Sequence, residues 1–270
     1  MEEIKKKFGI HTVIGARRTK FEKAQNIGIV SIDAFVSKEP ITAVISKFGW
    51  VRIIKGHMSC TSSVKHKEGD EEKYVIHTYT TSNLIACTKF GKFYTISMSQ
   101  LSRSKGEVEN IRILIDLDQG DDVLDIFEYN EQDKFLLVST KGKGFIVEAP
   151  FVFAQTRSGK TVMNLADDSQ ARFCIKLDEN HDHIAIVGTN RKFLVFDLNE
   201  IPQMKRGQGV ALQKYKNAEV SDLKTFRMTE GVCFKYDGST RTVNNLKLWL
   251  AKRGGVGKLP PVGFPRSNKF

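Results

Sequence analysis

The stretch Leu84-Ile-Ala-Cys-Thr-Lys-Phe-Gly-Lys-Phe-Tyr-Thr-Ile96 decides the fold of this chain. Two short runs of aliphatic, β-branched and aromatic residues flank a polar turn that ends in Gly91, which is the pattern of a β-hairpin. Glycine adopts the positive φ angles that tight hairpin turns need. The stretch therefore predicts two antiparallel strands joined at Gly91.

This hairpin pattern occurs five times along the chain. Short strands at a period of roughly 47 residues leave room for about four strands in each unit. Four-stranded units at such a spacing are typical of propeller-like rings. The sequence therefore predicts an all-β fold of about five four-stranded blades. The equivalent turn positions are Gly49, Gly91, Gly142, Arg191 and Gly238.

Four basic, glycine-rich loops recur in phase with the hairpins. The lead arginine of each loop follows the preceding turn position by 12 or 15 residues, so the loops should return to the same edge of every unit. Lysine and arginine neutralise phosphates, and glycine lets backbone N–H groups approach them closely. Solvated turns are also rich in lysine and arginine, but four loops in phase favour a binding track for a polyanion. The loops are Arg103-Ser-Lys-Gly106, Arg157-Ser-Gly-Lys160, Lys205-Arg-Gly-Gln-Gly209 and Lys252-Arg-Gly-Gly-Val-Gly257.

The net charge of +11 is distributed unevenly. Residues 1–38 hold eight basic and four acidic side chains, and residues 251–270 hold five basic and no acidic ones. The repeats therefore carry only a small excess of positive charge, and their basic loops must be segregated from acids to attract a polyanion. The acidic stretch from Asp116 to Asp133 lies between two hairpins, which predicts that it sits away from the basic loops.

Composition excludes several other classes of protein. With 270 residues and 40% hydrophobic residues the chain can form a sizeable core, and no apolar run is long enough for a transmembrane helix. Four scattered cysteines without a CxxC pair favour free thiols in a reducing compartment. The segment His181-Asp182-His183 has metal-ligating residue types, but a surface turn is the favoured interpretation because no further ligand is clustered with it.

The combined motifs resemble the C-terminal domain of bacterial type IIA topoisomerase A subunits, and most closely that of topoisomerase IV in its alphaproteobacterial form. The resemblance covers nearly the whole chain. It rests on Glu39-Pro-Ile-Thr42, Phe48-Gly-Trp50, Gly91-Lys-Phe93, Lys141-Gly-Lys-Gly-Phe145, Gln155-Thr-Arg-Ser-Gly-Lys160, Asn190-Arg-Lys192, Arg206-Gly-Gln-Gly209 and Gly263-Phe-Pro-Arg-Ser-Asn-Lys-Phe270.

The resemblance implies a β-pinwheel, a ring of blades whose outer strands are exchanged between neighbours. It implies duplex DNA binding and bending without sequence specificity, with the DNA presented to the cleavage core for ATP-dependent decatenation and supercoil relaxation. The implied partners are double-stranded DNA and, in the parent heterotetramer, the catalytic core of the A subunit together with the ATPase (B) subunit, with no membrane. The resemblance implies that this domain uses no cofactor, and that ATP and Mg²⁺ are used elsewhere in the parent enzyme. It also implies a cytoplasmic, nucleoid-associated location.

Two departures from the family pattern qualify these expectations. The glycine-rich box of gyrase is degenerate in Gln203-Met-Lys-Arg-Gly-Gln-Gly209, which argues for decatenation and relaxation rather than gyrase-like wrapping. The family's catalytic tyrosine and its ATPase domain are not found in this sequence, so we expect no catalysis by this piece alone. We expect residues 1–28 to be a linker remnant, 29–258 to be the β-pinwheel, and the Pro-rich tail 259–270 to be extended or mobile.

The candidate DNA contacts are basic residues in the hairpin turns and glycine-rich loops, each proposed to bind a phosphate. Three alternatives stay open. They are a propeller-type scaffold for protein interaction, a gyrase-like DNA-wrapping domain, and an enzyme with a central active site. The candidate residues are Lys47, Arg52, Lys55, Lys89, Lys92, Arg103, Lys105, Lys141, Lys143, Arg157, Lys160, Arg191, Lys192, Lys205, Arg206, Lys214 and Arg241.

Overall fold

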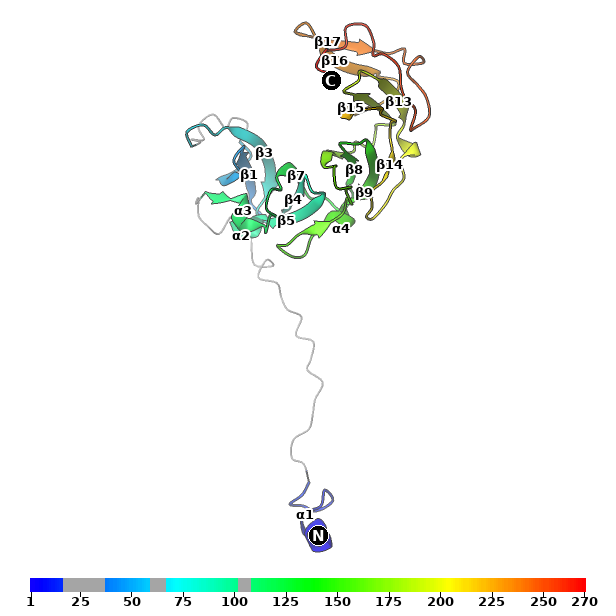
Figure 1. Cartoon of the computed structure of the whole chain (residues 1–270). Helices are drawn as coiled ribbons and strands as arrows, with labels where there is room; N and C mark the ends of the chain where they lie inside the picture. Colours follow the sequence, from blue (N-terminus) through cyan, green and yellow to red (C-terminus); the bar gives the residue numbers. More distant parts are fainter. Residues whose placement is uncertain (17–36, 59–66, 102–107) are drawn as a thin grey trace. The chain divides into compact units, whose positions relative to one another are not determined.

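The computed structural model describes residues 1–16, 37–58, 67–101 and 108–270, which form two compact units. The first unit, Met1–Phe35, contains helix α1 (Glu2–Phe8), none of whose residues is buried. The second unit, Val36–Phe270, contains the strands (Figure 1). In the described part of the chain, no helix has the length and apolar character needed to cross a membrane. The predicted boundary at residue 28 lies outside the described residues.

The first sheet shows the construction that the other sheets repeat. Its strands are β1 (Pro40–Ser46), β2 (Trp50–Lys55), β3 (Glu72–Tyr79) and β6 (Glu109–Asn110). β1 and β2 form the central hairpin, β3 pairs with the free edge of β1, and β6 pairs with β2 beside the hairpin turn. All three pairings are antiparallel, so the first sheet has the order β3-β1-β2-β6.

The second and third sheets have the same construction. The strands of the second sheet are β4 (Asn83–Thr88), β5 (Lys92–Ser97), β7 (Val123–Glu128) and β10 (Lys160–Thr161). The strands of the third sheet are β8 (Lys134–Ser139), β9 (Lys143–Glu148), β11 (Ala171–Lys176) and β14 (Val210–Ala211). In every case the outer strand follows the hairpin of the next sheet along the chain, since β6 follows β4 and β5, and β10 follows β8 and β9. This exchange of outer strands makes the fold the predicted β-pinwheel.

The last two sheets are smaller than predicted. The fourth contains β12 (His183–Gly188), β13 (Phe193–Asp197) and β15 (Val220–Phe226), and a single bridge from Phe193 to Lys258 stands where the outer strand would be. The fifth contains only the hairpin of β16 (Val232–Tyr236) and β17 (Ser239–Val243). All five predicted hairpins are present, but within the described residues only the first three sheets have four strands.

Short helical turns follow the second strand of three hairpins. They are α2 (Met98–Leu101), α4 (Ala149–Val152) and the 3₁₀ turn η3 (Leu198–Glu200). A fourth helical turn, α3 (Ile111–Leu114), follows the outer strand β6, and the side chain of Asn110 caps it by accepting a bond from the Arg112 N–H. The turns α2, α4 and η3 lie between each hairpin and the outer strand of the preceding sheet, whereas α3 lies between the outer strand β6 and β7.

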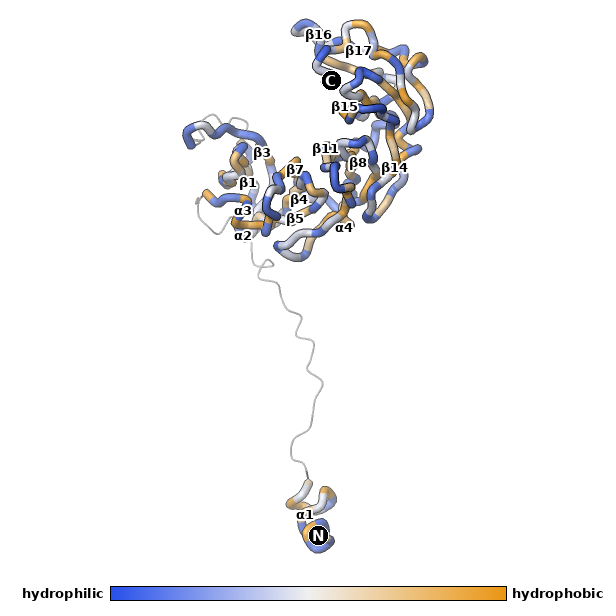
Figure 2. Tube along the Cα trace, in the orientation of Figure 1, coloured by the Kyte–Doolittle hydropathy of each residue, from blue (hydrophilic) through white to orange (hydrophobic). Residues whose placement is uncertain are grey.

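Successive sheets of the second unit pack face to face. Four clusters of buried side chains lie between neighbouring sheets, and each draws residues from both. One cluster joins Ala43 of β1 to Leu84 of β4, and the next joins Phe93 of β5 to Phe135 of β8. Apolar residues are concentrated in the strands and polar residues in the turns, as the hydropathy colouring shows (Figure 2). Burial of both faces explains why the strands read as apolar runs rather than alternating patterns.

The five predicted turn positions adopt the same backbone conformation. In the first three sheets the carbonyl oxygen of the turn glycine accepts a backbone N–H from the segment that follows the outer strand, at 2.8–3.0 Å. The N–H of Ile111 donates to Gly49 O, that of Met163 to Gly91 O, and that of Leu212 to Gly142 O. The φ angles are 82° at Gly49, 75° at Gly91, 75° at Gly142, 59° at Arg191 and 74° at Gly238. The sequence repeat therefore identified these turns correctly.

Candidate nucleic-acid interface

Each described basic loop leads directly into the outer strand of the preceding sheet. Arg157–Lys160 leads into β10, residues 205–209 lead into β14, and residues 252–257 lead to the Lys258 bridge. The constant offset in the sequence thus returns the loops to one edge of consecutive sheets, as predicted. The first loop lies outside the described residues, and with it the candidates Arg103 and Lys105.

The lead arginine of each of the three described loops contacts the segment of the preceding outer strand. Arg157 Nε donates to Leu114 O at 3.2 Å, and its Nη2 donates to Ile113 O. Arg206 Nε donates to Asn164 Oδ1 at 3.2 Å. Consecutive loops are therefore linked along the edges of the sheets, and these arginines have a structural role besides any contact with DNA.

The fourth loop repeats this contact. Arg253 Nη1 donates to Ala211 O at 2.8 Å, and its Nε donates to Glu200 O at 2.9 Å. Backbone bonds reinforce the links, since the N–H of Asn164 donates to Gly207 O and that of Gly254 donates to Leu212 O, both at 2.8 Å. We use the term outer belt for residues 109–116, 157–164, 205–212 and 252–258.

The turn lysines of the first three sheets are bound to carboxylates. Lys47 Nζ lies 3.2 Å from Glu71, and Lys89 Nζ lies 2.9 Å from Asp122. Lys141 Nζ lies 2.9 Å from Asp168 and 3.6 Å from Glu219. The acids come from the residues just before the third strand of a sheet, which antiparallel pairing places beside the hairpin turn.

The expectation that the acidic stretch lies away from the basic loops is wrong for Asp116, and other acids of the stretch lie beside lysines of the second turn. Lys92 adds a further pair, since its Nζ lies 2.6 Å from Asp118. Asp116 lies 4.0 Å from Nη2 of Arg157 in the outer belt. Residues far apart in the sequence meet because β7 folds back beside β4, and sequence spacing alone does not show this.

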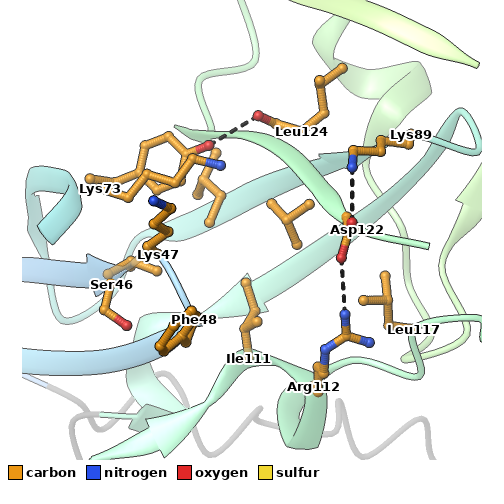
Figure 3. Close-up of a pocket in the computed structure, with 15 residues that line it drawn as sticks. Ser46, Lys47, Phe48, Lys73, Lys89, Ile111, Arg112, Leu117, Asp122 and Leu124 are labelled. Atoms are coloured by element: carbon orange, nitrogen blue, oxygen red, sulfur yellow. Dashed lines mark hydrogen bonds and ion pairs between the residues drawn. The ribbon is translucent and has the colours of Figure 1, made fainter. Parts of the chain in front are cut away.

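A pocket of about 560 Å³ lies between the turns of the first two sheets and contains one of these pairs. Figure 3 shows Asp122 between Lys89 and Arg112, with Lys47 and Lys73 also lining the pocket. The two carboxylate oxygens of Asp122 lie 2.9 Å from Lys89 Nζ and 3.1 Å from Arg112 Nη2. The hydrogen bond from Lys89, with the charges of Lys89 and Arg112, lowers the pKa of Asp122 despite partial desolvation. Four cations and one carboxylate leave this pocket positively charged.

Most other candidate residues have no carboxylate partner within the described chain. Lys143 Nζ donates to Gln208 Oε1 at 2.8 Å, Lys205 Nζ lies 4.8 Å from the Phe151 ring, and Arg241 lies over the ring of Tyr236. The remaining ones, which are exposed or half-buried, are Arg52, Lys55, Lys160, Lys192 and Lys214.

Arg191 has a structural role besides any contact with DNA. Its guanidinium donates to Pro265 O at 3.0 Å, to Asn268 Oδ1 at 3.2 Å and to Phe264 O at 3.3 Å. It therefore holds the C-terminal segment against the turn of the fourth sheet.

The tail, residues 259–270, is packed rather than mobile. Phe264 is buried, and its ring lies 5.5 Å from that of Phe193, while the ring of Phe270 lies 5.8 Å from the same residue. Polar contacts add to this, since Ser221 Oγ donates to Asn268 O at 3.0 Å. The two phenylalanine side chains provide apolar surface that can be buried. The free energy gained by burying it outweighs the tendency of a proline-rich segment to stay extended.

The candidate list missed Lys73, Arg112, Lys252 and Arg253, which lie in the outer belt or line the pocket. Lys252 and Arg253 had a clear signal, because they open a loop that is in phase with the others. Lys73 and Arg112 had none, because only the packing of the first two sheets brings them to the pocket.

The histidine segment offers no metal site in the described chain. No group of three or more potential ligands is present among the described residues. His181 Nδ1 lies 2.9 Å from Thr225 Oγ1, and His183 Nδ1 lies 2.7 Å from Asp182 Oδ1. The two rings thus have hydrogen-bonding partners, one on β15 and one in the turn itself.

Comparison with known proteins identifies the family. The family model described as "DNA gyrase C-terminal domain, beta-propeller" matches residues 133–172 and 182–225. The chain is 44% identical over its whole length to the A subunit of DNA topoisomerase 4 from Rickettsia bellii, covering 36% of that protein. It is 33% identical over 94% of its length to the same protein of Caulobacter vibrioides, covering 33% of it. The chain thus spans about a third of the length of these relatives.

Solved structures share the fold at lower sequence identity. The E. coli ParC C-terminal domain superposes with a TM-score of 0.74 at 21% identity, over 84% of this chain and 96% of that one. The C-terminal domain of DNA gyrase A gives a TM-score of 0.56 at 19% identity, over 82% and 76% of the two chains. Sequence, family model and fold agree, and the chain belongs to the family of C-terminal domains of topoisomerase IV A subunits, in the form that Rickettsia and Caulobacter share.

Proposed function

We propose that this chain binds and bends duplex DNA without sequence specificity. The observation that carries the proposal is the outer belt, in which consecutive basic, glycine-rich loops are linked along the edges of consecutive sheets. A duplex presents a phosphate at short, regular intervals, so a row of cations contacts many phosphates at once. Contacts of this kind fix the path of DNA without reading its bases.

Bending follows from a row of contacts that extends over several sheets. Smoothly bending 20–30 base pairs by 40–90° costs about 1–6 kcal/mol. One lysine–phosphate contact cannot offset that cost, but several contacts acting together can. In the parent enzyme we propose that the bent duplex is presented to the cleavage core, which works with the ATPase subunit for decatenation and relaxation. ATP and Mg²⁺ act there and not in this domain.

The salt dependence of binding tests the proposal. If about six phosphates are neutralised, log K should fall with log salt with a slope of about −5. Fluorescence anisotropy with a 30-base-pair duplex between 50 and 300 mM KCl measures this slope. A slope near zero would contradict the proposal, and so would a strong preference for one DNA sequence.

Lysine variants locate the surface. Lys160→Ala in the outer belt should weaken binding to all sequences alike and reduce the slope by about one. Lys134→Ala is a matched control, because Lys134 pairs with Glu148 at the end of the hairpin opposite the turn and carries the same charge. Equal losses in the two variants would show that net charge, and not this surface, decides the affinity.

Bending and wrapping need separate measurements. Energy transfer between dyes at the two ends of the duplex should rise on binding if the DNA is bent. A topoisomer assay on relaxed plasmid distinguishes a gyrase-like domain, which would trap supercoils of one sign. We expect no such bias, since the box at Gln203–Gly209 departs from the gyrase pattern.

A further inference from the structure

We propose that Glu71, Asp122 and Asp168 act as built-in counter-ions that limit the affinity of this domain for DNA. In the absence of DNA each carboxylate holds a turn lysine that would otherwise bind a phosphate. The proposal rests on the DNA-binding function proposed above and names residues that regulate it. The three pairs are Lys47–Glu71, Lys89–Asp122 and Lys141–Asp168.

The repetition of the contact is the first argument. The first two sheets have it at equivalent positions. In the third sheet Thr140 makes the equivalent backbone contact, to Gln170 O at 2.8 Å, and Lys141, the next residue of the turn, binds Asp168.

In the first two sheets the same two residues are joined twice. The backbone N–H of Lys47 donates to Glu71 O at 2.8 Å and that of Lys89 to Asp122 O at 3.0 Å, besides the side-chain pairs. The backbone bond keeps the carboxylate beside its lysine even when the side chains separate. A released lysine can therefore be recaptured at once.

The fourth sheet, like the third, has a threonine at the position of Lys47 and Lys89. Thr189 takes the place of the lysine, and its N–H donates to Glu219 O at 2.9 Å, so the backbone contact is kept. The carboxylate of Glu219 instead lies 3.6 Å from Lys141 of the third sheet, which already has Asp168. The acid in front of the third strand of the fourth sheet therefore also reaches a turn lysine, but one of the neighbouring sheet.

The pairs are exposed, which suits a contact that DNA has to displace. The side chains of Lys89 and Asp122 are 41% and 53% exposed, and those of Lys47 and Glu71 are 61% and 71% exposed. Exposed ion pairs contribute little free energy, so a phosphate can replace the carboxylate at low cost. Each pair then weakens DNA binding by a modest factor and does not block it.

Asp122 should have the largest effect of the three. It holds Lys89 and Arg112 together in the lining of the positively charged pocket (Figure 3). Its removal frees two cations, whereas removal of Glu71 frees one. Lys141 keeps Glu219 when Asp168 is removed, so Asp168 should have the smallest effect.

Isosteric neutral variants provide the test. Glu71→Gln and Asp122→Asn should each bind a 30-base-pair duplex about two- to fivefold more tightly at 50 mM KCl. The salt slope should steepen by about one for Glu71→Gln and by up to about two for Asp122→Asn. The adjacent acid Glu72, which lies outside the three pairs, provides the matched control as Glu72→Gln. Equal effects of Glu71→Gln and Glu72→Gln would overturn the proposal, because the gain would then come from net charge alone.

A measurement without DNA separates this proposal from the proposed function. NMR titration of the Asp122 carboxyl should give a pKa that rises toward the ordinary aspartate value in Lys89→Met. An unchanged pKa in that variant overturns the counter-ion pair whatever the DNA result. Failure of the unmodified domain to bind DNA overturns the proposed function, and the regulatory role of the acids with it.

Discussion

The turns of the second and fourth sheets occupy equivalent positions but are stabilised in different ways. At Gly91 the segment that follows the outer strand lies so close that a Cβ atom would stand 2.5 Å from Met163 O. At Arg191 the turn keeps a positive φ of 59°, and a side chain reaches out to hold the C-terminal tail. The same repeat position is thus contacted by the segment after an outer strand in the second sheet and by the C-terminal tail in the fourth sheet. The difference teaches that an internal repeat fixes the backbone of a turn but not what covers it.

The largest expected effect concerns the tail that covers the fourth turn. Phe264→Ala should lower the free energy of unfolding by about 3–5 kcal/mol, because it leaves a cavity among aromatic rings. Urea denaturation of the whole chain measures the change. Val262→Ala is the control within the same tail, since Val262 is 84% exposed and should change the stability by less than about 0.5 kcal/mol. Similar values for both variants would show that the tail is not packed as described.

The turn covered by an outer strand should be nearly as sensitive. Gly91→Ala should cost about 3 kcal/mol, because alanine is strained at positive φ and its Cβ meets backbone atoms of Met163. Gly238→Ala is the matched control, with a φ of 74° and no atom within 4 Å of the added Cβ. It should cost only about 1 kcal/mol. Denaturation curves that coincide for the two variants would contradict the close approach of the outer strand.

Arg191 allows the two parts of its role to be separated. Arg191→Ala loses three hydrogen bonds to the tail and keeps the unfavourable φ, so we expect a loss of about 2 kcal/mol in unfolding free energy. Arg191→Gly loses the same bonds but relieves the backbone strain, and should recover about 1 kcal/mol of that loss. If alanine and glycine gave the same stability, the positive φ at this turn would be refuted.

The smallest effect concerns pH and the pair at the second turn. The pKa of Asp122 is lowered in the folded state, chiefly by the hydrogen bond from Lys89, so the folded protein binds this proton less readily than the unfolded chain. The stability from this pair is therefore complete above about pH 4 and is lost as the pH falls through the lowered pKa. Stability curves between pH 2 and 6 should be shallower for Lys89→Met than for the unmodified domain. Parallel curves would show that the pair contributes nothing.

The sequence was most informative about the repeat. Hairpin turns with glycine or arginine at five equivalent positions, and basic loops at a constant offset, predicted five hairpins and the edge along which the loops return. It failed at contacts between residues far apart in the sequence. Asp122 meets Lys89 across the second sheet and Arg112 from the first sheet, and such pairs depend on how strands pair and how neighbouring sheets pack. It also overestimated the strand count of the last two sheets, since a repeat indicates where strands begin but not whether an outer strand follows.

What the sequence determined by itself is local: which residues form strands, where the chain turns, and where the basic loops stand relative to each turn. These features depend on side-chain type and on the φ angles that glycine permits, both of which can be read along the chain. Only the tertiary structure decided which cations are bound to acids, which arginines tie the outer belt together, and that the tail is packed. Those outcomes depend on distances between residues far apart in sequence, and packing of the sheets sets these distances.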